Sequence, residues 1–246
     1  IPYLLSVLVD TLQSEMGKMA ENQNATNYMR IRGKLDQVMR DPRQQFMFDR
    51  KFAHDSMAEF MARMLRLPVD GRPISVIDLS GVPTSIVSAV VSVLSRIVFD
   101  FAVWSRGERK RPVVLICEEA HRYIPNRTIS RTSPVRDVLE RIAKEGRKYG
   151  ISLCVVSQRP AELDATILSQ CNTIFSMRLT NERDQQILRA GISDAASSLL
   201  DFMPTMGTGE AITFGEGVAL PTRIKFDTLP AEEWPMSNTA SVTGSW

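Results

Sequence analysis

The chain has 246 residues, of which 43% are hydrophobic and 24% are charged, and its formal net charge at pH 7 is +2. This composition supports one substantial core and excludes wholesale disorder, and so small a charge does not by itself indicate a nucleic-acid binder. The three cysteines lack the spacing of metal ligands and are typical of reduced thiols in a cytoplasmic protein.

The first part of the chain has the pattern of helices. Apolar residues recur every three or four positions in residues 4–12, 28–38 and 57–65, which places them on one face of each helix. Turn-forming residues in "ENQNATN" and "RDPRQQ" separate these stretches. We therefore predict a helical segment or subdomain at residues 1–70.

From residue 71 onwards, short apolar runs alternate with helical stretches. Four runs have the composition of strands: 74–79, 112–117, 151–156 and 173–179. Three helical stretches lie between them: 85–104, 134–148 and 161–170. Gly150 is a helix-stop signal after the second of these. The alternation predicts an α/β fold with a mainly parallel sheet that helices cover on both faces.

The stretch 85–104 is the most apolar part of the chain. Arg96 and Asp100 interrupt it, and a membrane span tolerates such charges badly. We therefore predict a helix that is buried on most of its faces, and no membrane partner.

The end of the chain differs from the rest. The stretch "GEAITFGEGVALPTRIKF" predicts an antiparallel hairpin, with two strands joined around Gly215 and Gly217. Residues 227–246 are polar, so we predict a mobile tail.

Polar residues follow three of the predicted strands. Asp78 and Ser80 follow the first, Glu118 and Glu119 the second, and Gln158 the third. The carboxyl ends of parallel strands meet at one edge of a sheet, where ligands bind. Nucleotide hydrolysis uses such an arrangement, because one carboxylate can hold Mg²⁺ through water and the next can polarise the attacking water.

Other interpretations of these polar residues stay open. The two glutamates could cap a helical turn, where negative charge is favourable. Gln158 could contact a terminal phosphate or simply form a loop. His121 with Glu118 and Glu119 would suit a metal-dependent hydrolase, but the chain lacks the H-E-x-x-H spacing of a helical metal site.

Basic residues occur in two places that bear on function. Arg147 and Lys148 lie in the last turn of a predicted helix, where they could complement its dipole or neutralise phosphate charge. Four arginines lie in and beside the loop after the acid pair: Arg122, Arg127, Arg131 and Arg136. They would suit contacts to a DNA backbone, although arginine-rich loops are also common on surfaces.

Several motifs occur together in a specific order. "VVLICEEAHRYIP", "RIAKEGRKYGISLCVVSQRPAELDATILSQCNTIFSMRLTNERDQ" and "GTGEAITFGEGVALPTRIKF" resemble the HerA family of hexameric RecA-like DNA translocases, within the FtsK/HerA superfamily. The resemblance covers residues 74–226. It implies a RecA-like P-loop NTPase core at residues 71–226, into which the helical segment is inserted.

The resemblance also implies roles for single residues. Glu118 matches the metal-side acid of the Walker B motif, although many relatives have Asp there, and Glu119 matches the catalytic glutamate. Gln158 matches the polar sensor on the next strand. Arg147 matches a basic residue that contacts the γ-phosphate, with Lys148 beside it. Whether Arg147 acts within its own subunit or across an interface is left open.

The glycine-rich phosphate loop of such enzymes is not recognisable in the sequence. The two Gly-Lys pairs, in "EMGKM" and "IRGKL", lack the first glycine and the Ser or Thr of the pattern. We expect the chain to start after this loop and to be inactive alone.

The resemblance further implies ATP and Mg²⁺ as cofactors and a homo-oligomeric, hexameric ring on double-stranded DNA. It also implies a nuclease or other effector partner, in DNA repair or anti-phage defence. A RecA-like scaffold that recruits an effector without hydrolysing ATP is the alternative.

Overall fold

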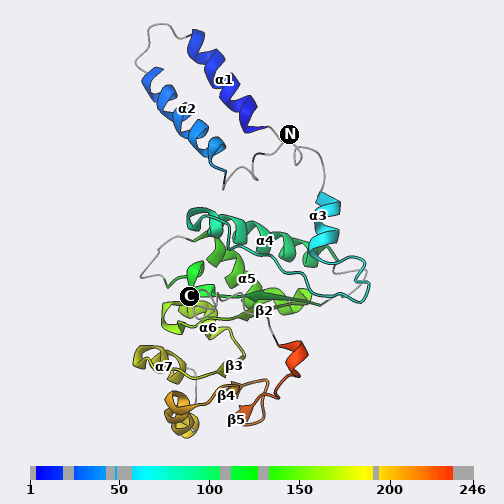
Figure 1. The fold of residues 1–246 in the computed structure, drawn as a ribbon, viewed down its shortest axis with the longest axis vertical. Helices are drawn as coiled ribbons and strands as arrows, with labels where there is room; N and C mark the ends of the chain where they lie inside the picture. Colours follow the sequence, from blue (N-terminus) through cyan, green and yellow to red (C-terminus); the bar gives the residue numbers. More distant parts are fainter. Residues whose placement is uncertain are drawn as a thin grey trace, which may run out of the picture. The chain divides into compact units, whose positions relative to one another are not determined.

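The computed structural model of the chain describes residues 4–18, 25–42, 48, 57–105, 112–126, 133–190 and 194–234 (Figure 1). The chain divides into two compact units, Ile1–Val87 and Ser88–Trp246. This division falls inside helix α4, Thr84–Trp104.

The first unit contains helices in the region where apolar spacing predicts them. Helices α1 (Leu5–Lys18) and α2 (Ala25–Arg40) pack side by side, and α3 (Met57–Met64) follows (Figure 1). No residue of α3 is buried, whereas Val9 of α1 is 9% exposed. The apolar stripe therefore predicts the helices but does not by itself ensure burial.

Residues 74–79 do not form the predicted strand. They are extended without a paired neighbour, and Ile74 and Val76 are 77% and 87% exposed. A strand needs backbone hydrogen bonds to a second strand, and the described residues provide none here. Asp78 instead forms a local turn, in which its Oδ1 accepts a hydrogen bond from the Ser80 amide at 2.8 Å. That amide lowers the pKa of Asp78.

The second unit contains the predicted parallel pairing. Strand β1 (Val113–Cys117) pairs in parallel with β2 (Ile151–Val155), in a register that sets Cys117 against Val155. Helix α5 (Pro134–Tyr149) connects the two strands and packs on β2. It ends at Gly150, whose φ of 80° lies in the left-handed region, so the predicted helix stop is confirmed.

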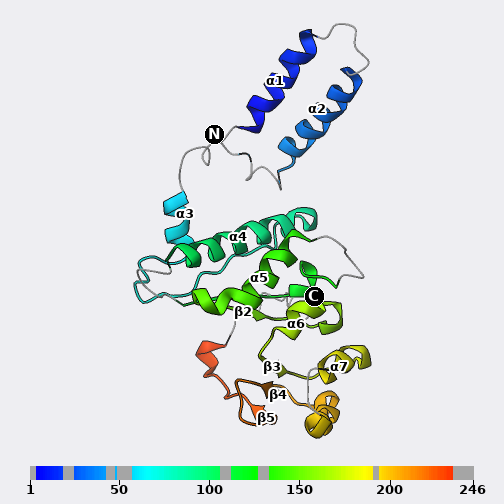
Figure 2. The same cartoon turned by 180° about the vertical axis from the view of Figure 1, so that it is seen from behind.

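In the part of the chain that the structure describes, helices cover one face of this sheet rather than both faces as predicted. Side chains alternate along β1, so that Leu115 points to the covered face while Val114 and Ile116 are 60% and 62% exposed. The covering helices lie in two layers, with α4 on α5 (Figure 2). Phe99 of α4 meets Tyr149 of α5 edge-on at 5.5 Å between ring centroids.

Helix α4 is buried along one side only, and the prediction of burial on most faces is wrong. Val91, Val98 and Phe99 are buried, whereas Val93 and Trp104 are 58% and 76% exposed. Within the described residues, Ile86–Trp104 is the one segment that is long and apolar enough to cross a membrane. That property rests on length and composition alone.

The fourth predicted strand does not join the parallel sheet. Strand β3 (Thr173–Ser176) pairs antiparallel with β4 (Glu210–Gly215), which pairs antiparallel with β5 (Thr222–Lys225). The pair β4–β5 is the expected hairpin, and β3 pairs with it as a third strand. At Gly215, φ is 109° and a Cβ would lie 2.1 Å from the carbonyl oxygen of Asn172, so only glycine fits.

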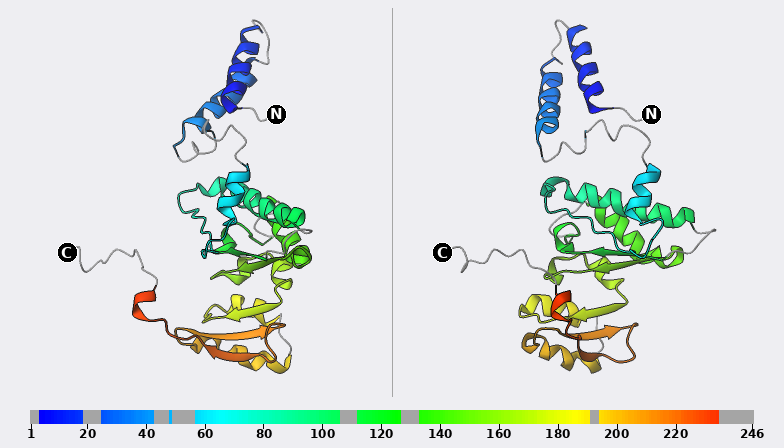
Figure 3. Two further views of the ribbon diagram at one scale, coloured as in Figure 1. Left: turned by 90° about the vertical axis from the view of Figure 1, so that its right-hand side faces the viewer. Right: turned by 45° about the vertical axis from the view of Figure 1, so that its right-hand side comes forward.

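The three-stranded sheet packs on η6 (Asp194–Thr205), beside α7 (Glu182–Arg189) (Figure 3). The residues of this core are Leu188, Leu200, Met203, Met206, Ile212 and Phe214. The Ser176 hydroxyl contacts the sulfur of Met203 at 3.0 Å.

Short helical turns complete the second unit: η4 (Ala120–Arg122), η5 (Pro160–Glu162), α6 (Ala165–Ser169) and η7 (Ala231–Glu233). The predicted helix 161–170 is thus a 3-10 turn followed by a shorter α-helix. Of the predicted tail, residues 235–246 lie outside the described residues.

Candidate functional site

The loops that follow β1 and β2 lie side by side at the carboxyl edge of the parallel sheet. The Val156 amide donates to the carbonyl of Cys117 at 2.9 Å, and the Ala120 amide donates to the carbonyl of Val156 at 3.0 Å. These bonds continue the strand pairing past the acid pair. The predicted meeting of Glu119 and Gln158 at one edge is therefore observed.

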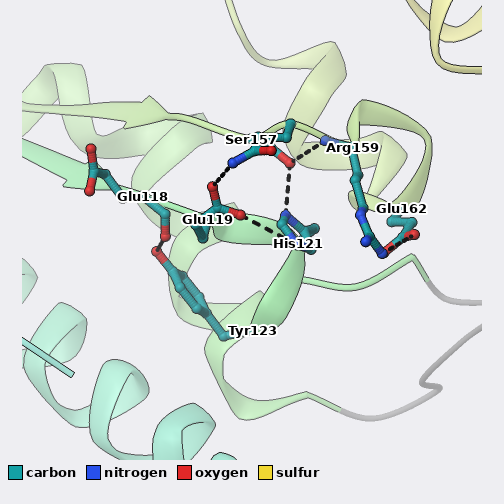
Figure 4. Close-up of polar contacts among 8 residues, drawn as sticks. Glu118, Glu119, His121, Tyr123, Ser157, Arg159 and Glu162 are labelled. Carbon is teal, nitrogen blue, oxygen red and sulfur yellow. Dashed lines mark hydrogen bonds and ion pairs between the residues drawn. The ribbon is translucent and has the colours of Figure 1, made fainter. Parts of the chain in front are cut away.

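Glu119 is the centre of the cluster at this edge (Figure 4). Its Oε1 accepts a hydrogen bond from Gln158 Nε2 at 2.7 Å, and its Oε2 lies 3.5 Å from His121 Nε2. The side chain is 41% exposed. The carboxylate is thus held by Gln158 on one oxygen, lies close to His121 on the other, and is still open to a ligand or water.

The backbone of Glu119 is unusual for a residue with a side chain. Its φ of 47° and ψ of 41° lie in the left-handed region. This conformation costs about 1–2 kcal/mol outside glycine. It turns the chain directly from β1 into η4, and such outliers cluster at functional sites.

Glu118 points away from Glu119, as Figure 4 shows, and is exposed. The Tyr123 hydroxyl donates to the carbonyl of Glu118 at 2.8 Å and so anchors the turn. Burial raises the pKa of the Tyr123 phenol, which keeps this donor protonated. Burial also raises the pKa of the neighbouring Cys117 thiol to about 11.

The carboxylate and histidine side chains near Glu119 determine which metal ion the site could hold. An exposed carboxylate such as Glu118 suits Mg²⁺, which keeps most of its waters and takes few protein ligands. In the described part of the chain, no group of three His, Cys, Asp or Glu side chains is arranged around a metal position. Glu118, Glu119 and His121 therefore do not form the three-ligand site of the alternative hydrolase.

Arg147 and Lys148 lie at the other edge of the sheet. Both are exposed in the last turn of α5, and Gly150 leads from there into the amino end of β2. Gln158 follows the carboxyl end of the same strand. Within one chain, the structure thus does not bring Arg147 together with Glu119.

The four loop arginines do not form one patch. Arg122 is exposed in η4, and Arg127 and Arg131 lie outside the described residues. Arg136 is only 3% exposed, and its Nε lies 3.1 Å from Asp164 Oδ2. The prediction that Arg136 contacts DNA is therefore wrong, because its guanidinium is enclosed beside a buried carboxylate.

Arg136 instead helps to fasten the two loops that carry the cluster. It also donates through Nη2 to the carbonyl of Pro125 at 2.8 Å. The Asn126 amide donates to the carbonyl of Glu162 at 2.7 Å, and the Asp164 amide donates to the carbonyl of Ile124 at 3.2 Å. The loop after β1 is thus tied to the loop after β2.

The sequence predicted no role for two residues of the site. Asp164 caps α6, with its Oδ1 accepting from the Thr166 amide at 2.9 Å. Asp is a favoured capping residue, but this one lies inside the predicted helix 161–170. Ser157 contacts His121 through its hydroxyl at 3.1 Å. Its position at the end of the third predicted strand, directly before Gln158, was the available signal.

Comparisons with known proteins find similarity to proteins that are named helicases. A family profile described as "Helicase HerA, central domain" matches residues 4–98. A "Probable helicase" of Methanocaldococcus jannaschii is 27% identical over 232 residues, which is 90% of this chain and 42% of the relative. The "DNA double-strand break repair helicase HerA" of Pyrococcus furiosus is 38% identical over 114 residues, which is 46% of this chain and 20% of the relative.

The chain therefore spans less than half the length of these two relatives. Among solved structures, the genome packaging NTPase B204 from Sulfolobus turreted icosahedral virus 2, in complex with ATP-gammaS, has a TM-score of 0.47 and 14% sequence identity. That match covers 72% of this chain and 94% of the other.

Proposed function

Because this chain belongs to the HerA family, we propose that it is part of an ATP-hydrolysing motor that moves on double-stranded DNA. The observation that carries the proposal is the 2.7 Å hydrogen bond between Gln158 and Glu119, at the carboxyl edge of adjacent parallel strands. Ligands of open α/β sheets bind at this edge.

Each residue of the cluster has a role in this proposal. Glu119 accepts a hydrogen bond from the attacking water and polarises it, for which its partly exposed carboxylate is suited. The second N–H of the Gln158 amide donates to an oxygen of the terminal phosphate. Glu118 would hold Mg²⁺ through water, and the metal would neutralise charge on the phosphates.

Arg147, with Lys148 beside it, acts across a subunit interface. The reason is geometric, since both residues lie at the edge of the sheet opposite Glu119 in their own chain. A homo-oligomeric, hexameric ring would set this edge of one subunit against the nucleotide of the next. Mixing Glu119→Gln subunits with Arg147→Ala subunits should then restore part of the activity, because some interfaces would contain both intact residues.

DNA would lie against basic residues in and after η4. Arg122, Arg127 and Arg131 remain candidates for phosphate contacts in this proposal, which also includes a nuclease or other effector and a cytoplasmic location. The names of the relatives, a DNA double-strand break repair helicase among them, support a role in DNA processing.

The test is DNA-stimulated ATP hydrolysis by the full-length gene product. Glu119→Gln should lower kcat by about 100-fold or more, because the amide cannot act as a base. The matched control is Glu162→Gln, which changes an exposed glutamate on the adjacent loop and should leave the rate unchanged. Equal turnover by wild type and Glu119→Gln would remove Glu119 from the mechanism. A wild-type protein that binds partners without hydrolysis would favour the scaffold alternative.

A further inference from the structure

His121 lies between the catalytic candidate and the loop after β2 (Figure 4). It sits in η4, one position past Ala120, and its side chain is 13% exposed. Its Nε2 lies 3.5 Å from Glu119 Oε2, and its Nδ1 lies 3.1 Å from Ser157 Oγ. Both ring nitrogens therefore face a polar partner.

The partners select one tautomer of the neutral ring. If Nδ1 carried the proton, the lone pair of Nε2 would face the Glu119 carboxylate, and the two would repel each other. With the proton on Nε2, the ring donates toward Oε2, and Nδ1 accepts from the Ser157 hydroxyl. That hydroxyl is free to donate, because its oxygen accepts from the Arg159 amide at 3.0 Å.

This chain of contacts reaches the oxygen of Glu119 that Gln158 does not hold. Gln158 contacts Oε1, whereas His121 faces Oε2. A carboxylate with one anchor can rotate about its last torsion, which is broad. Two anchors on two oxygens fix its plane. If Gln158 turns toward a phosphate, the contact from His121 remains.

We infer that His121 is a positioning residue: together with Ser157, it holds the Glu119 carboxylate in the orientation that polarises water. This inference rests on the proposed function for its catalytic consequence. The orientation of the ring does not depend on that function and can be measured separately.

The first experiment measures the tautomer directly in this chain by nitrogen–proton correlation NMR of its histidine rings. The sequence contains two histidines, so the spectrum of His121→Gln assigns the signals. We expect the Nε2–H form at His121, and we expect Ser157→Ala to raise the share of the Nδ1–H form. A wild-type ring protonated on Nδ1, or a ring that does not respond to Ser157→Ala and Glu119→Gln, would overturn the inference.

The second experiment measures steady-state ATP hydrolysis by the full-length protein. His121→Ala should lower kcat by about 10- to 100-fold, because a misplaced catalytic group loses about that much. KM for ATP should stay within about twofold, since the contact serves water activation and not substrate binding. His121→Gln should recover part of the rate, because its amide can still donate to Oε2.

The effects of Ser157→Ala and His121→Ala should not add, because both act through the same ring. Thermal unfolding of each variant controls for a loss of folding, and recovery by His121→Gln separates positioning from packing.

The outcomes distinguish the two hypotheses. If wild type hydrolyses ATP, Glu119→Gln does not and His121→Ala matches wild type, the inference is wrong and the proposed function stands. If wild type itself does not hydrolyse ATP, the proposed function fails, and the NMR result alone decides whether His121 orients Glu119.

Discussion

The parallel pair β1–β2 and the antiparallel sheet β3–β4–β5 bury their residues differently, although both belong to one compact unit. In β1 every second side chain is exposed up to Ile116, whereas four consecutive residues of β4 are buried: Ala211, Ile212, Thr213 and Phe214. The cluster of Glu119, Gln158 and His121 lies at the carboxyl end of the pair β1–β2, which has one exposed face. The tightly packed sheet contributes no residue to it.

This difference separates the residues that stabilise the unit from the residues that a ligand can reach. A core residue enclosed on all sides contributes to the free energy of unfolding, and a ligand cannot reach it. A site needs access, so its backbone lies in a less enclosed region. Four measurements test whether the two sheets differ in this way.

The largest effect is expected in the antiparallel sheet. Phe214 is 2% exposed, so Phe214→Ala should lower the free energy of unfolding by about 3–5 kcal/mol through lost burial and a cavity. Val114 of β1 is 60% exposed, and Val114→Ala should change it by less than about 0.5 kcal/mol. Urea denaturation of both variants gives the two values. Similar losses would show that the two sheets are equally enclosed.

Next comes the ion pair that ties the two site loops. Arg136→Ala leaves Asp164 buried without its cation and should cost about 3 kcal/mol. The control is Arg159→Ala, which breaks an exposed pair with Glu162 and should cost less than about 1 kcal/mol. Both values come from denaturation curves. A negligible cost for Arg136→Ala would mean that the loops are held without this pair.

Cysteine reactivity reports on the two faces of the parallel sheet. Cys154 is exposed, whereas Cys117 is buried and has a pKa raised to about 11, so little of it is thiolate at neutral pH. We expect iodoacetamide to alkylate Cys154 at least about 100-fold faster than Cys117. Peptide mass spectrometry follows each site, and Cys154→Ser identifies the fast phase. Comparable rates would contradict the assignment of the open face.

A smaller effect is expected at the left-handed residue. Glu119→Gly should raise the free energy of unfolding by about 1 kcal/mol, since glycine adopts this conformation without strain. Glu119→Ala removes the same carboxylate but keeps the Cβ, so it should show no such gain. If both variants are equally stable, the turn is not strained.

Local signals in the sequence predicted the elements around the site. Apolar β-branched runs predicted β1 and β2, and Gly150 predicted the end of α5. The pairing of Glu119 with Gln158 followed from the rule for parallel strands. These predictions succeeded because each depends on a short stretch of chain and one general rule of topology.

The predictions that failed depend on distant partners. Residues 74–79 have the composition of a strand but no paired neighbour, and β3 pairs with the hairpin instead of the parallel sheet. In the sequence, Arg136 resembles a surface arginine. In the structure it is buried beside Asp164, which lies far from it in the sequence. Composition does not encode which segment a strand or a charge will meet.

Oxidation of the methionines in the antiparallel core would report local unfolding of that core. Met203 and Met206 are 0% and 1% exposed, so peroxide can reach their sulfurs only when the packing around them separates. A sulfoxide is polar and would not fit back among Leu200, Ile212 and Phe214. Each oxidation would therefore trap an open molecule, and oxidative damage would accumulate in a core that is closed to solvent in the folded state.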